Sequence, residues 1–175
     1  VASDECYLSF SSNAKSILEL AKGDNTGLLA VHSLSKSSNM AGYRAAFIVG
    51  DPKLIDQIRQ IRKHAGLMVA APVQAAMITA LSDNAHVIEQ VNRYSNRRDI
   101  LSSALKAAGF TIEHSKAGLY IWCAKGENCF KTVDWFASRG ILVTPGSFYG
   151  DDNFVRVALT ATDENINKAS ERIKS

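Results

Sequence analysis

The sequence predicts an α/β protein made of two parts. In the first part, short apolar runs typical of buried strands alternate with amphipathic helical segments, which favours a layer with parallel strands. In the second part, a long polar-rich segment precedes strand-like runs and further helices, which is the pattern of an α+β unit. We therefore expect two domains, at residues 1–84 and 85–175, with a bridging helix at 85–108.

The strand-like elements are expected from short runs of apolar residues between turn residues. Val1 and Ala2 resemble the end of a strand that runs into a polar turn at 3–5. The further strand-like runs lie at 28–32, 45–49, 110–114, 119–124, 141–144 and 154–159. The residues at 144–150, TPGSFYG, are expected to form a loop.

The helices are expected from apolar residues at helical spacing and from capping residues. Asp51 and Pro52 are a typical N-cap and first helical residue, and Pro72 opens a second helix in the same way. Gly109 is a plausible C-terminal residue for the bridging helix. The other predicted helices lie at 13–20, 130–138 and 163–173.

The composition excludes several classes of protein. Hydrophobic residues make up 46% of 175 residues, which argues against global disorder. A net charge of +3 is too small to indicate a nucleic-acid partner, and we interpret the basic residues at 97–98 and 59–63 as solvated helix faces. Because no apolar run approaches the roughly 20 residues of a membrane span, we expect no membrane partner.

The cysteines bear on the compartment. Cys6, Cys123 and Cys129 are odd in number and lack metal-ligand spacing, so we expect neither a disulfide framework nor a metal, and a reducing cytoplasm fits best. The chain begins at Val1 with a strand-like end, so we expect a fragment of a longer protein.

Lys36 is the first candidate functional residue. It lies in HSLSKSSNMAGYRAAF, directly after a buried strand-like run and among small hydroxyl residues. One interpretation is a solvated loop lysine among turn serines. The other is a nucleophilic amine, which condenses with a carbonyl to a Schiff base.

The neighbours of Lys36 favour the second interpretation. Ser33 and Ser35 offer hydroxyl groups, Arg44 offers a charged fork suited to phosphate, and Gly42 permits a close backbone approach. An amine that needs a carbonyl, beside groups that bind phosphate, indicates a phosphorylated aldehyde. Pyridoxal phosphate is the obvious candidate cofactor.

The stretch SLSKSSNMAGYR resembles the lysine region, S-x-S-K-x(7)-R, of class I and II aminotransferases, which are fold-type I pyridoxal-phosphate enzymes. The resemblance implies that Lys36 holds the cofactor and moves the substrate proton. It also implies that Ser33, Ser35 and Arg44 anchor the phosphate.

The stretch SDECY resembles the D-E-x-Y segment of the same family. The resemblance implies that Asp4 binds the protonated pyridine nitrogen, so that the ring stays an electron sink. It also implies that Tyr7 hydrogen-bonds the phenolic oxygen of the ring. Read alone, the segment is better explained as a turn with a half-buried tyrosine.

Arg156 lies in NFVRVALT, which resembles the family's late strand. On a strand, its side chain points away from those of Val155 and Val157. The resemblance implies that Arg156 binds the substrate α-carboxylate through a bidentate pair. The alternative is an edge-strand arginine that faces water. Pro145, Gly146 and Phe148 are expected to shape the mouth of the site.

The resemblance covers the whole chain, but only the C-terminal part of a family member. It implies a truncated fold-type I architecture, with a remnant of the large sheet domain and a small α+β domain. It further implies transamination between glutamate and a 2-keto acid, a homodimer as the full-length protein, and little activity for the fragment alone. A β-eliminating lyase on the same scaffold and a cofactor-binding sensor domain of a transcription regulator are the alternatives.

Three stretches carry a finer resemblance, to actinobacterial succinyldiaminopimelate aminotransferases of lysine biosynthesis. They are AGLYIW, TVDWFASRGILVTPGSFYG and RVALTATDENI. His64, His86 and His114 form no recognisable constellation, and His32 is expected to pack at a strand end. Cys6 is expected to be a small buried filler.

Overall fold

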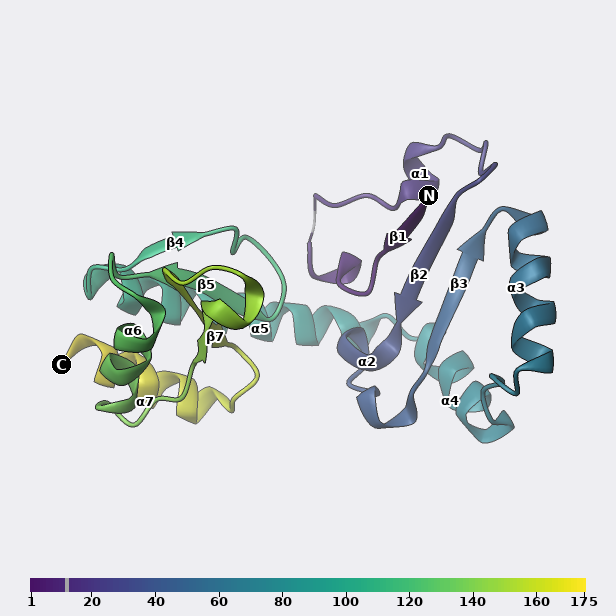
Figure 1. Cartoon of the computed structure of the whole chain (residues 1–175). Helices are drawn as coiled ribbons and strands as arrows, with labels where there is room; N and C mark the ends of the chain where they lie inside the picture. The colour runs from purple at the N-terminus through teal and green to yellow at the C-terminus, as the bar shows by residue number, and fades with distance from the viewer. Residues whose placement is uncertain (12) are drawn as a thin grey trace. The chain divides into compact units, whose positions relative to one another are not determined.

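A computed structural model describes residues 1–11 and 13–175 of the chain (Figure 1). The chain divides into two compact units, Val1–Val91 and Asn92–Ser175. The division falls inside helix α5 (Ala85–Ala107), the 23-residue helix expected near 85–108. Both units combine a small sheet with helices, which confirms the α/β class.

The sheet of the first unit has three strands in the order β1-β2-β3. They are β1 (Ala2–Asp4), β2 (Leu29–Ser33) and β3 (Ala46–Gly50). Strand β1 runs parallel to β2, as expected, but β3 runs antiparallel to it. The expectation of parallel strands is wrong for β3 because residues 34–45 turn in short helical segments and lead straight back, whereas a parallel partner needs a crossover across the sheet.

The predicted polar turn at 3–5 is also wrong. Strand β1 continues through Asp4, and the Glu5 N–H donates to the carbonyl of Val31 at 2.8 Å. The parallel ladder therefore includes residues whose polarity suggested a turn, because backbone hydrogen bonds form whatever the side chain.

The sequence predicted two helices of the first unit well, α3 (Pro52–His64) and α4 (Ala71–Leu81). Asp51 caps α3, since its carboxylate accepts from the Lys53 N–H at 2.8 Å and from the Gly27 N–H at 2.8 Å. The other helical segments of this unit are α1 (Ile17–Leu20), α2 (Leu34–Ser37) and the 3-10 turns η1 (Leu8–Phe10) and η2 (Ala41–Tyr43).

The sheet of the second unit is antiparallel throughout, in the order β4-β5-β7-β6. Its elements are β4 (Thr111–Glu113), β5 (Tyr120–Ala124), α6 (Cys129–Ala137), β6 (Thr144–Pro145), the 3-10 turn η3 (Gly146–Tyr149), β7 (Phe154–Ala158) and α7 (Asp163–Lys174). The strand expected at 141–144 is wrong, apart from its last residue. The Ile141 N–H instead closes the end of α6 by donating to the carbonyl of Phe136.

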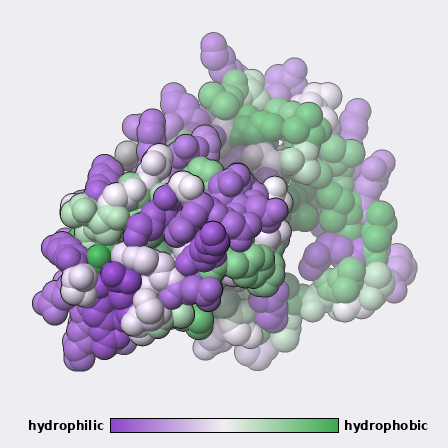
Figure 2. Space-filling view, turned by 60° about the vertical axis from the view of Figure 1, so that its left-hand side comes forward, coloured by the Kyte–Doolittle hydropathy of each residue, from purple (hydrophilic) through white to green (hydrophobic). Residues whose placement is uncertain are grey.

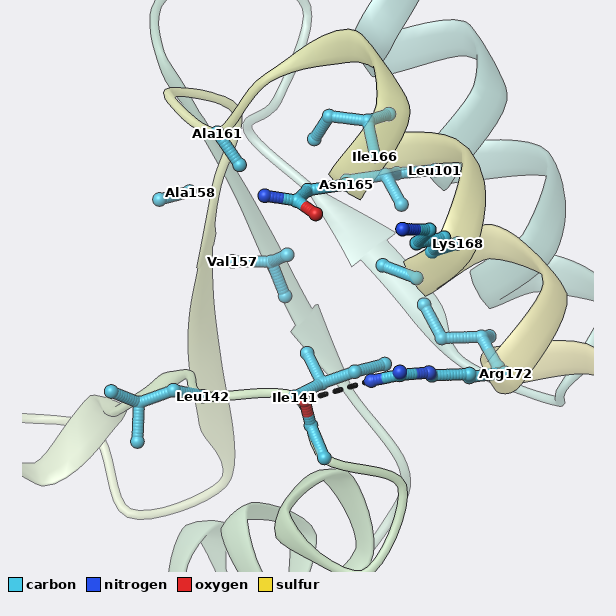
Figure 3. A pocket seen from close by; sticks show the side chains of 13 residues that line it. Leu101, Ile141, Leu142, Val157, Ala158, Ala161, Asn165, Ile166, Lys168 and Arg172 are labelled. Atoms are coloured by element: carbon cyan, nitrogen blue, oxygen red, sulfur yellow. Dashed lines mark hydrogen bonds between the residues drawn. The ribbon is translucent and has the colours of Figure 1, made fainter.

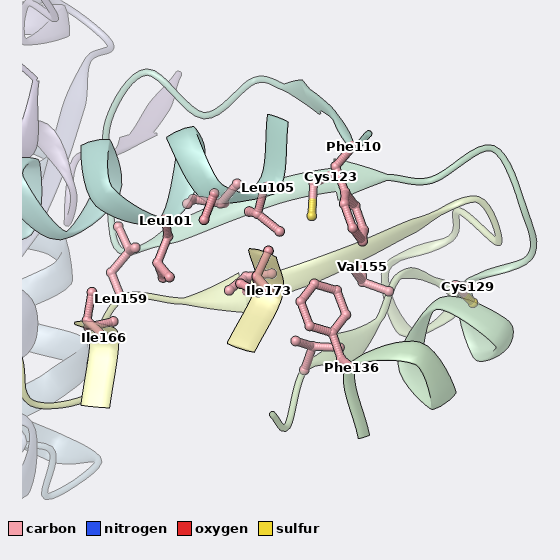
Figure 4. Packing of buried hydrophobic residues seen from close by; sticks show 14 residues of the cluster. Leu101, Leu105, Phe110, Cys123, Cys129, Phe136, Val155, Leu159, Ile166 and Ile173 are labelled. Atoms are coloured by element: carbon pink, nitrogen blue, oxygen red, sulfur yellow. The ribbon is translucent and has the colours of Figure 1, made fainter. Parts of the chain in front are cut away.

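A hydrophobic core fills the second unit between its sheet and helices α5, α6 and α7 (Figure 4). Phe136, Leu105 and Ile121 have no exposed surface. The cluster contains Leu101, Ala104, Leu105, Phe110, Ile121, Cys123, Cys129, Phe136, Val143, Val155, Val157, Leu159, Ile166 and Ile173.

Two basic residues of α5, Arg97 and Arg98, were expected on a solvated helix face, and this expectation is wrong. Arg97 and Arg98 are only 7% and 9% exposed, whereas residues 59–63 are exposed as expected. Arg97 donates to the carboxylate of Asp163 at 2.5 Å and to the carbonyl of Leu159 at 3.1 Å, and Arg98 donates to the carbonyl of Gly118. Burial is possible because these acceptors replace water, and burial lowers the pKa of Arg98.

Three further properties concern the described part of the chain alone. Within residues 1–11 and 13–175, no helix is long and apolar enough to cross a bilayer. The same residues contain no group of three or more His, Cys, Asp or Glu that could hold a metal ion. Cys6, Cys123 and Cys129 are free thiols.

Candidate functional site

Six of the seven predicted site residues lie in the first unit, near one edge of its sheet (Figure 1). Strands β1 and β2 are parallel, so their carboxyl ends, Asp4 and Ser33, lie at the same edge, which is where ligands bind in α/β sheets. Lys36 follows Ser33 on α2. Arg44 precedes β3, whose first residue Ala46 pairs with Ser33.

The two serines form a compact turn at the start of α2. The Ser33 Oγ accepts from the Ser35 N–H at 3.1 Å and lies 2.9 Å from the Ser35 Oγ. The same Ser33 hydroxyl reaches the carbonyl of Ala45 at 3.4 Å. Helix α2 was not predicted, although a serine at the N-cap position is a usual signal of a helix start.

Lys36 and Arg44 are cations without anionic partners in the described residues. Lys36 is half-buried, and its Nζ makes no hydrogen bond or ion pair there. Arg44 is exposed and donates from Nη1 to the carbonyl of Ala41 at 3.1 Å. Its backbone is left-handed, with φ of 52°, which is uncommon for a residue with a side chain.

Asp4 is held in its ionised form by its neighbour. The thiol and the backbone N–H of Cys6 both donate to the Asp4 carboxylate, and these hydrogen bonds lower the pKa of Asp4. Burial, together with Asp4, raises the pKa of Cys6 to about 11, so Cys6 stays a thiol donor. The expected role of Cys6 as a buried filler is therefore incomplete, since it is half-buried and supports Asp4.

Tyr7 lies three residues after Asp4, at the start of η1. It is 41% exposed, and its ring centroid is 6.2 Å from that of Phe10. A half-exposed phenol at this sheet edge is compatible with contact to a bound ring.

A contact between buried Glu5 and half-buried His32, beside this edge, was not predicted. Glu5 is 7% exposed, accepts from the Ile17 N–H at 2.8 Å and lies 3.5 Å from the Nε2 of His32. The ring of His32 stacks on Phe47 with centroids 5.0 Å apart, so His32 packs at the strand end as expected and also carries a polar contact.

The expectation that His86 belongs to no constellation is wrong. Its ring nitrogens lie 2.9 Å from the Ser38 Oγ and 3.2 Å from the Asp83 Oδ2. Ser38 and His86 are 48 positions apart, so no local sequence pattern could have linked them.

Arg156 is the one predicted site residue of the second unit. Val155 and Val157 are buried on the opposite face of β7, as strand alternation predicted. The guanidinium carbon of Arg156 lies 4.3 Å and 4.8 Å from the ring centroids of Tyr120 and Tyr149. Its buried Nε has no hydrogen-bond partner among the described residues, where the guanidinium contacts the two rings.

The loop before β7 has a structural reason for its glycine. A Cβ at Gly146 would lie 2.3 Å from the carbonyl oxygen of Phe154 and 2.4 Å from that of Asp151, so only glycine fits. Phe148 is 73% exposed. Its part in shaping a mouth of the site stays a prediction.

Two cavities lie away from most of these residues. One, of about 360 Å³, lies in the second unit between β7 and α7, and Figure 3 shows Val157, Asn165 and Arg172 around it. No predicted site residue lines it. The other, of about 780 Å³, lies in the first unit between the sheet, α3 and α4, and Arg44 lines it.

The residues at the sheet edge fit pyridoxal phosphate by their chemistry. An amine without an anionic partner suits an aldehyde, an ionised carboxylate suits a pyridinium nitrogen, and two hydroxyls with a free guanidinium suit a phosphate. These are Lys36, Asp4, Ser33, Ser35 and Arg44.

Comparison with known families and curated proteins gives a consistent result. The family model described as aminotransferase class I and II matches residues 1–173. A probable aminotransferase of Mycobacterium tuberculosis is 54% identical over 99% of this chain and 43% of its own length. The 4-dedimethylamino-4-oxo-anhydrotetracycline transaminase of Streptomyces rimosus is 51% identical over 99% of this chain and 50% of its own.

A solved structure supports the same relationship. An aminotransferase from Staphylococcus aureus superimposes with a TM-score of 0.86 at 29% identity, over 99% of this chain and 48% of its own. The chain therefore spans about half the length of the relatives it matches.

Proposed function

Because the chain belongs to the class I and II aminotransferase family, we propose that its residues serve the transfer of an amino group from an amino acid to a 2-keto acid. The observation that carries the proposal is the half-buried Lys36, which lacks an anionic partner in the described residues and lies on the turn capped by Ser33.

In this proposal the residues of the first unit bind the cofactor and move a proton. Pyridoxal phosphate, when bound, supplies a ring that withdraws electrons from the substrate α-carbon. Lys36 Nζ holds the cofactor and then carries the proton to or from that carbon. Asp4 stays ionised and binds the ring nitrogen, and Tyr7 donates to the phenolic oxygen. Ser33, Ser35 and Arg44 bind the phosphate.

Arg156 has the separate task of binding the substrate. Its guanidinium would form a bidentate pair with the α-carboxylate, which orients the substrate. The free Nε and the flanking rings of Tyr120 and Tyr149 support this role, because they leave the cation without a carboxylate of its own in the described residues.

The substrate is proposed from relatives and from the sequence. Glutamate is the proposed donor. N-succinyl-diaminopimelate, in lysine biosynthesis, is the proposed product of the acceptor side, and an LL-diaminopimelate aminotransferase of Dehalococcoides mccartyi, 35% identical over 87% of this chain, supports that class of compound. The more similar transaminase of Streptomyces rimosus acts, by its name, on a polycyclic ketone, which is the competing acceptor class. We also propose a cytoplasmic homodimer.

Transamination is favoured over the alternative activities. The relatives quoted above are named aminotransferases or transaminases, and none of these names describes a lyase or a transcription regulator. The same proton transfer would serve a β-eliminating lyase, so the assay must detect the transferred amino group rather than the loss of the α-proton.

The first experiment tests Lys36. Pyridoxal phosphate added to the full-length protein should give a visible absorbance band, and borohydride treatment should leave the cofactor mass on the peptide that contains Lys36. Lys36→Ala should abolish both signals, whereas Lys53→Ala, an exposed lysine on α3, should keep them. Capture on a different lysine, or no capture by the wild-type full-length protein, would overturn the assignment.

The second experiment tests the reaction. Single-turnover assays of the full-length protein with glutamate should yield 2-oxoglutarate and an amino product from the correct keto acid. Formation of ammonia and pyruvate from a β-substituted amino acid, without an amino product, would instead establish a lyase.

A further inference from the structure

A chain of hydrogen bonds links the start of α5 to the end of α2 within the first unit. The Nε2 of His86 lies 2.9 Å from the Ser38 Oγ, and the Nδ1 lies 3.2 Å from the Asp83 Oδ2. The other oxygen of Asp83 accepts from the Ala85 N–H at 2.8 Å. The carboxylate is thus fixed to the helix start, and the imidazole is fixed to the carboxylate.

The ionised carboxylate of Asp83 determines which groups donate and which accept in the Asp83–His86–Ser38 chain. The Ala85 N–H and the His86 ring both lower the pKa of Asp83, so the carboxylate is ionised and can only accept. The Nδ1 of His86 therefore carries a proton. The Nε2 accepts from the Ser38 hydroxyl when the imidazole is neutral and donates to it when the imidazole is protonated, so the contact with Ser38 exists in both states.

Ser38 lies where a side-chain contact can hold the C-terminal end of α2. It is the C-cap residue of α2, and its N–H donates to the carbonyl of Leu34 at 3.2 Å. Helix α2 has four residues, and a single turn of helix is not stable by itself. Side-chain contacts at its two ends, through Ser33 and Ser38, therefore determine how the turn is held.

We propose that the Asp83–His86–Ser38 chain is a positioning device for Lys36, the third residue of α2. This inference rests on the proposed function of Lys36. None of the three residues is placed in contact with the reacting atoms. They act by fixing the last part of the turn that carries the lysine, so that the Nζ points in one direction.

The same order of serine, histidine and carboxylate occurs in enzymes with a nucleophilic serine. Such a serine also requires donors for an oxyanion and room for a substrate. Ser38 lines neither of the two cavities described above, and its hydroxyl lies at the end of the lysine-bearing turn. The structure therefore favours positioning over acyl transfer.

The first test needs no cofactor. The rate at which Lys36 Nζ reacts with acetic anhydride is compared with that of exposed Lys53 in the same full chain, by peptide mass spectrometry. Ser38→Ala and His86→Leu should change this ratio by about threefold or more, which is the size expected for one lost hydrogen bond. Ser38→Thr keeps the hydroxyl, and His86→Gln keeps a polar atom near Ser38, so both should restore the wild-type ratio.

The second test uses the rate at which Lys36 captures pyridoxal phosphate, trapped by borohydride. Ser38→Ala and His86→Leu should each slow capture by about tenfold, and the double variant should be no slower than either, because both changes break the same chain. Additive losses, or a His86→Gln variant as slow as His86→Leu, would show a general structural effect and overturn the proposal.

The two tests separate this inference from the proposed function. If the wild-type chain captures no cofactor, the function of Lys36 fails, and the acetylation ratio still decides whether the chain of hydrogen bonds positions the amine. An unchanged ratio in both Ser38→Ala and His86→Leu refutes positioning whatever the cofactor does.

Discussion

The two units of this chain have similar lengths but are held together differently. The second unit surrounds a cluster of fourteen buried residues, whereas the buried hydrophobic residues of the first unit are few: Phe10, Ala30, Leu34 and Ala45. Helices α3 and α4 contain no buried residue, and Figure 2 shows hydrophobic side chains gathered on part of the surface. The exposed ones in the first unit include Ile61, Met68 and Ile78.

The contrast shows that the proposed cofactor residues lie in the unit with the weaker core. Polar contacts hold much of that unit: Asp51 joins α3 to Gly27, Glu5 joins β1 to α1, and Ser33 caps α2. Such contacts specify geometry, but each contributes only about 1 kcal/mol net. The second unit is stabilised by the burial of its hydrophobic cluster, and its strand β7 carries Arg156.

The largest expected effect comes from opening the core of the second unit. Phe136→Ala should reduce its free energy of unfolding by about 3–5 kcal/mol, because a fully buried ring leaves a cavity. Urea unfolding followed by tryptophan fluorescence measures this unit alone, since Trp122 and Trp135 both lie in it.

The matched change in the first unit should be nearly silent. Ile78 is 67% exposed on α4, so Ile78→Ala should alter the protection of α4 amides against hydrogen exchange by no more than about 0.5 kcal/mol. A loss comparable to that of Phe136→Ala would erase the contrast between the units.

The second largest effect is expected at the buried arginine of α5. Asp163→Asn removes the charge that faces Arg97 at 2.5 Å, and should cost about 1–2 kcal/mol in the same fluorescence assay, reduced by the 62% exposure of the Asp163 side chain. Glu164→Gln is the control, since Glu164 pairs with Lys168 in water, where such pairs contribute about 0.5 kcal/mol. Equal losses would mean that the burial of Arg97 does not strengthen its interaction with Asp163.

A helix cap gives the next smaller effect. The Thr162 Oγ1 accepts from the Asn165 N–H at 3.3 Å at the start of α7. Thr162→Ala should lower the urea midpoint of the second unit by an amount that corresponds to about 1 kcal/mol, and Thr162→Ser should restore most of it. If serine were no better than alanine, packing of the methyl group rather than capping would be responsible.

The smallest expected effect is an acid response of the first unit. Burial raises the pKa of Glu5, but the Ile17 N–H, Ser16, Ser3 and His32 outweigh it and the net pKa lies below 4.5. The depressed pKa means that this stabilisation is present above pH 4.5 and is lost as the pH falls through the folded-state value.

Amide exchange of β1 and β2 on both sides of pH 4.5 measures that response. Protection against exchange, corrected for the intrinsic pH dependence of amide exchange, should fall at the acid end, and Glu5→Gln should flatten this pH dependence. Glu19→Gln, which changes an exposed carboxylate on α1, should leave it intact. The same acid response in Glu5→Gln would assign it to another group.

The elements that the sequence predicted well are those with local causes. The α3 helix follows from Asp51, Pro52 and regular apolar spacing, and the face of β7 that carries Arg156 follows from strand alternation between two valines. The grouping of Lys36, Ser33 and Ser35 needed only closeness in sequence.

The features that the sequence could not predict depend on distant contacts. The direction of β3, the burial of Arg97 by Asp163, and the contact between His86 and Ser38 each join residues far apart along the chain. Helix α2 was missed for a different reason: four residues are too few for a periodic pattern, so only the capping serine could reveal it.

Arg44 illustrates a conflict between what a backbone prefers and what a side chain offers. Its left-handed conformation would suit glycine, which adopts positive φ without the penalty of roughly 1 kcal/mol that a Cβ incurs. Arg44→Gly should therefore relax the turn while it removes the guanidinium. A variant that folds better and binds phosphate worse would show that selection at this position has favoured charge over conformational ease, a compromise between activity and stability at one residue.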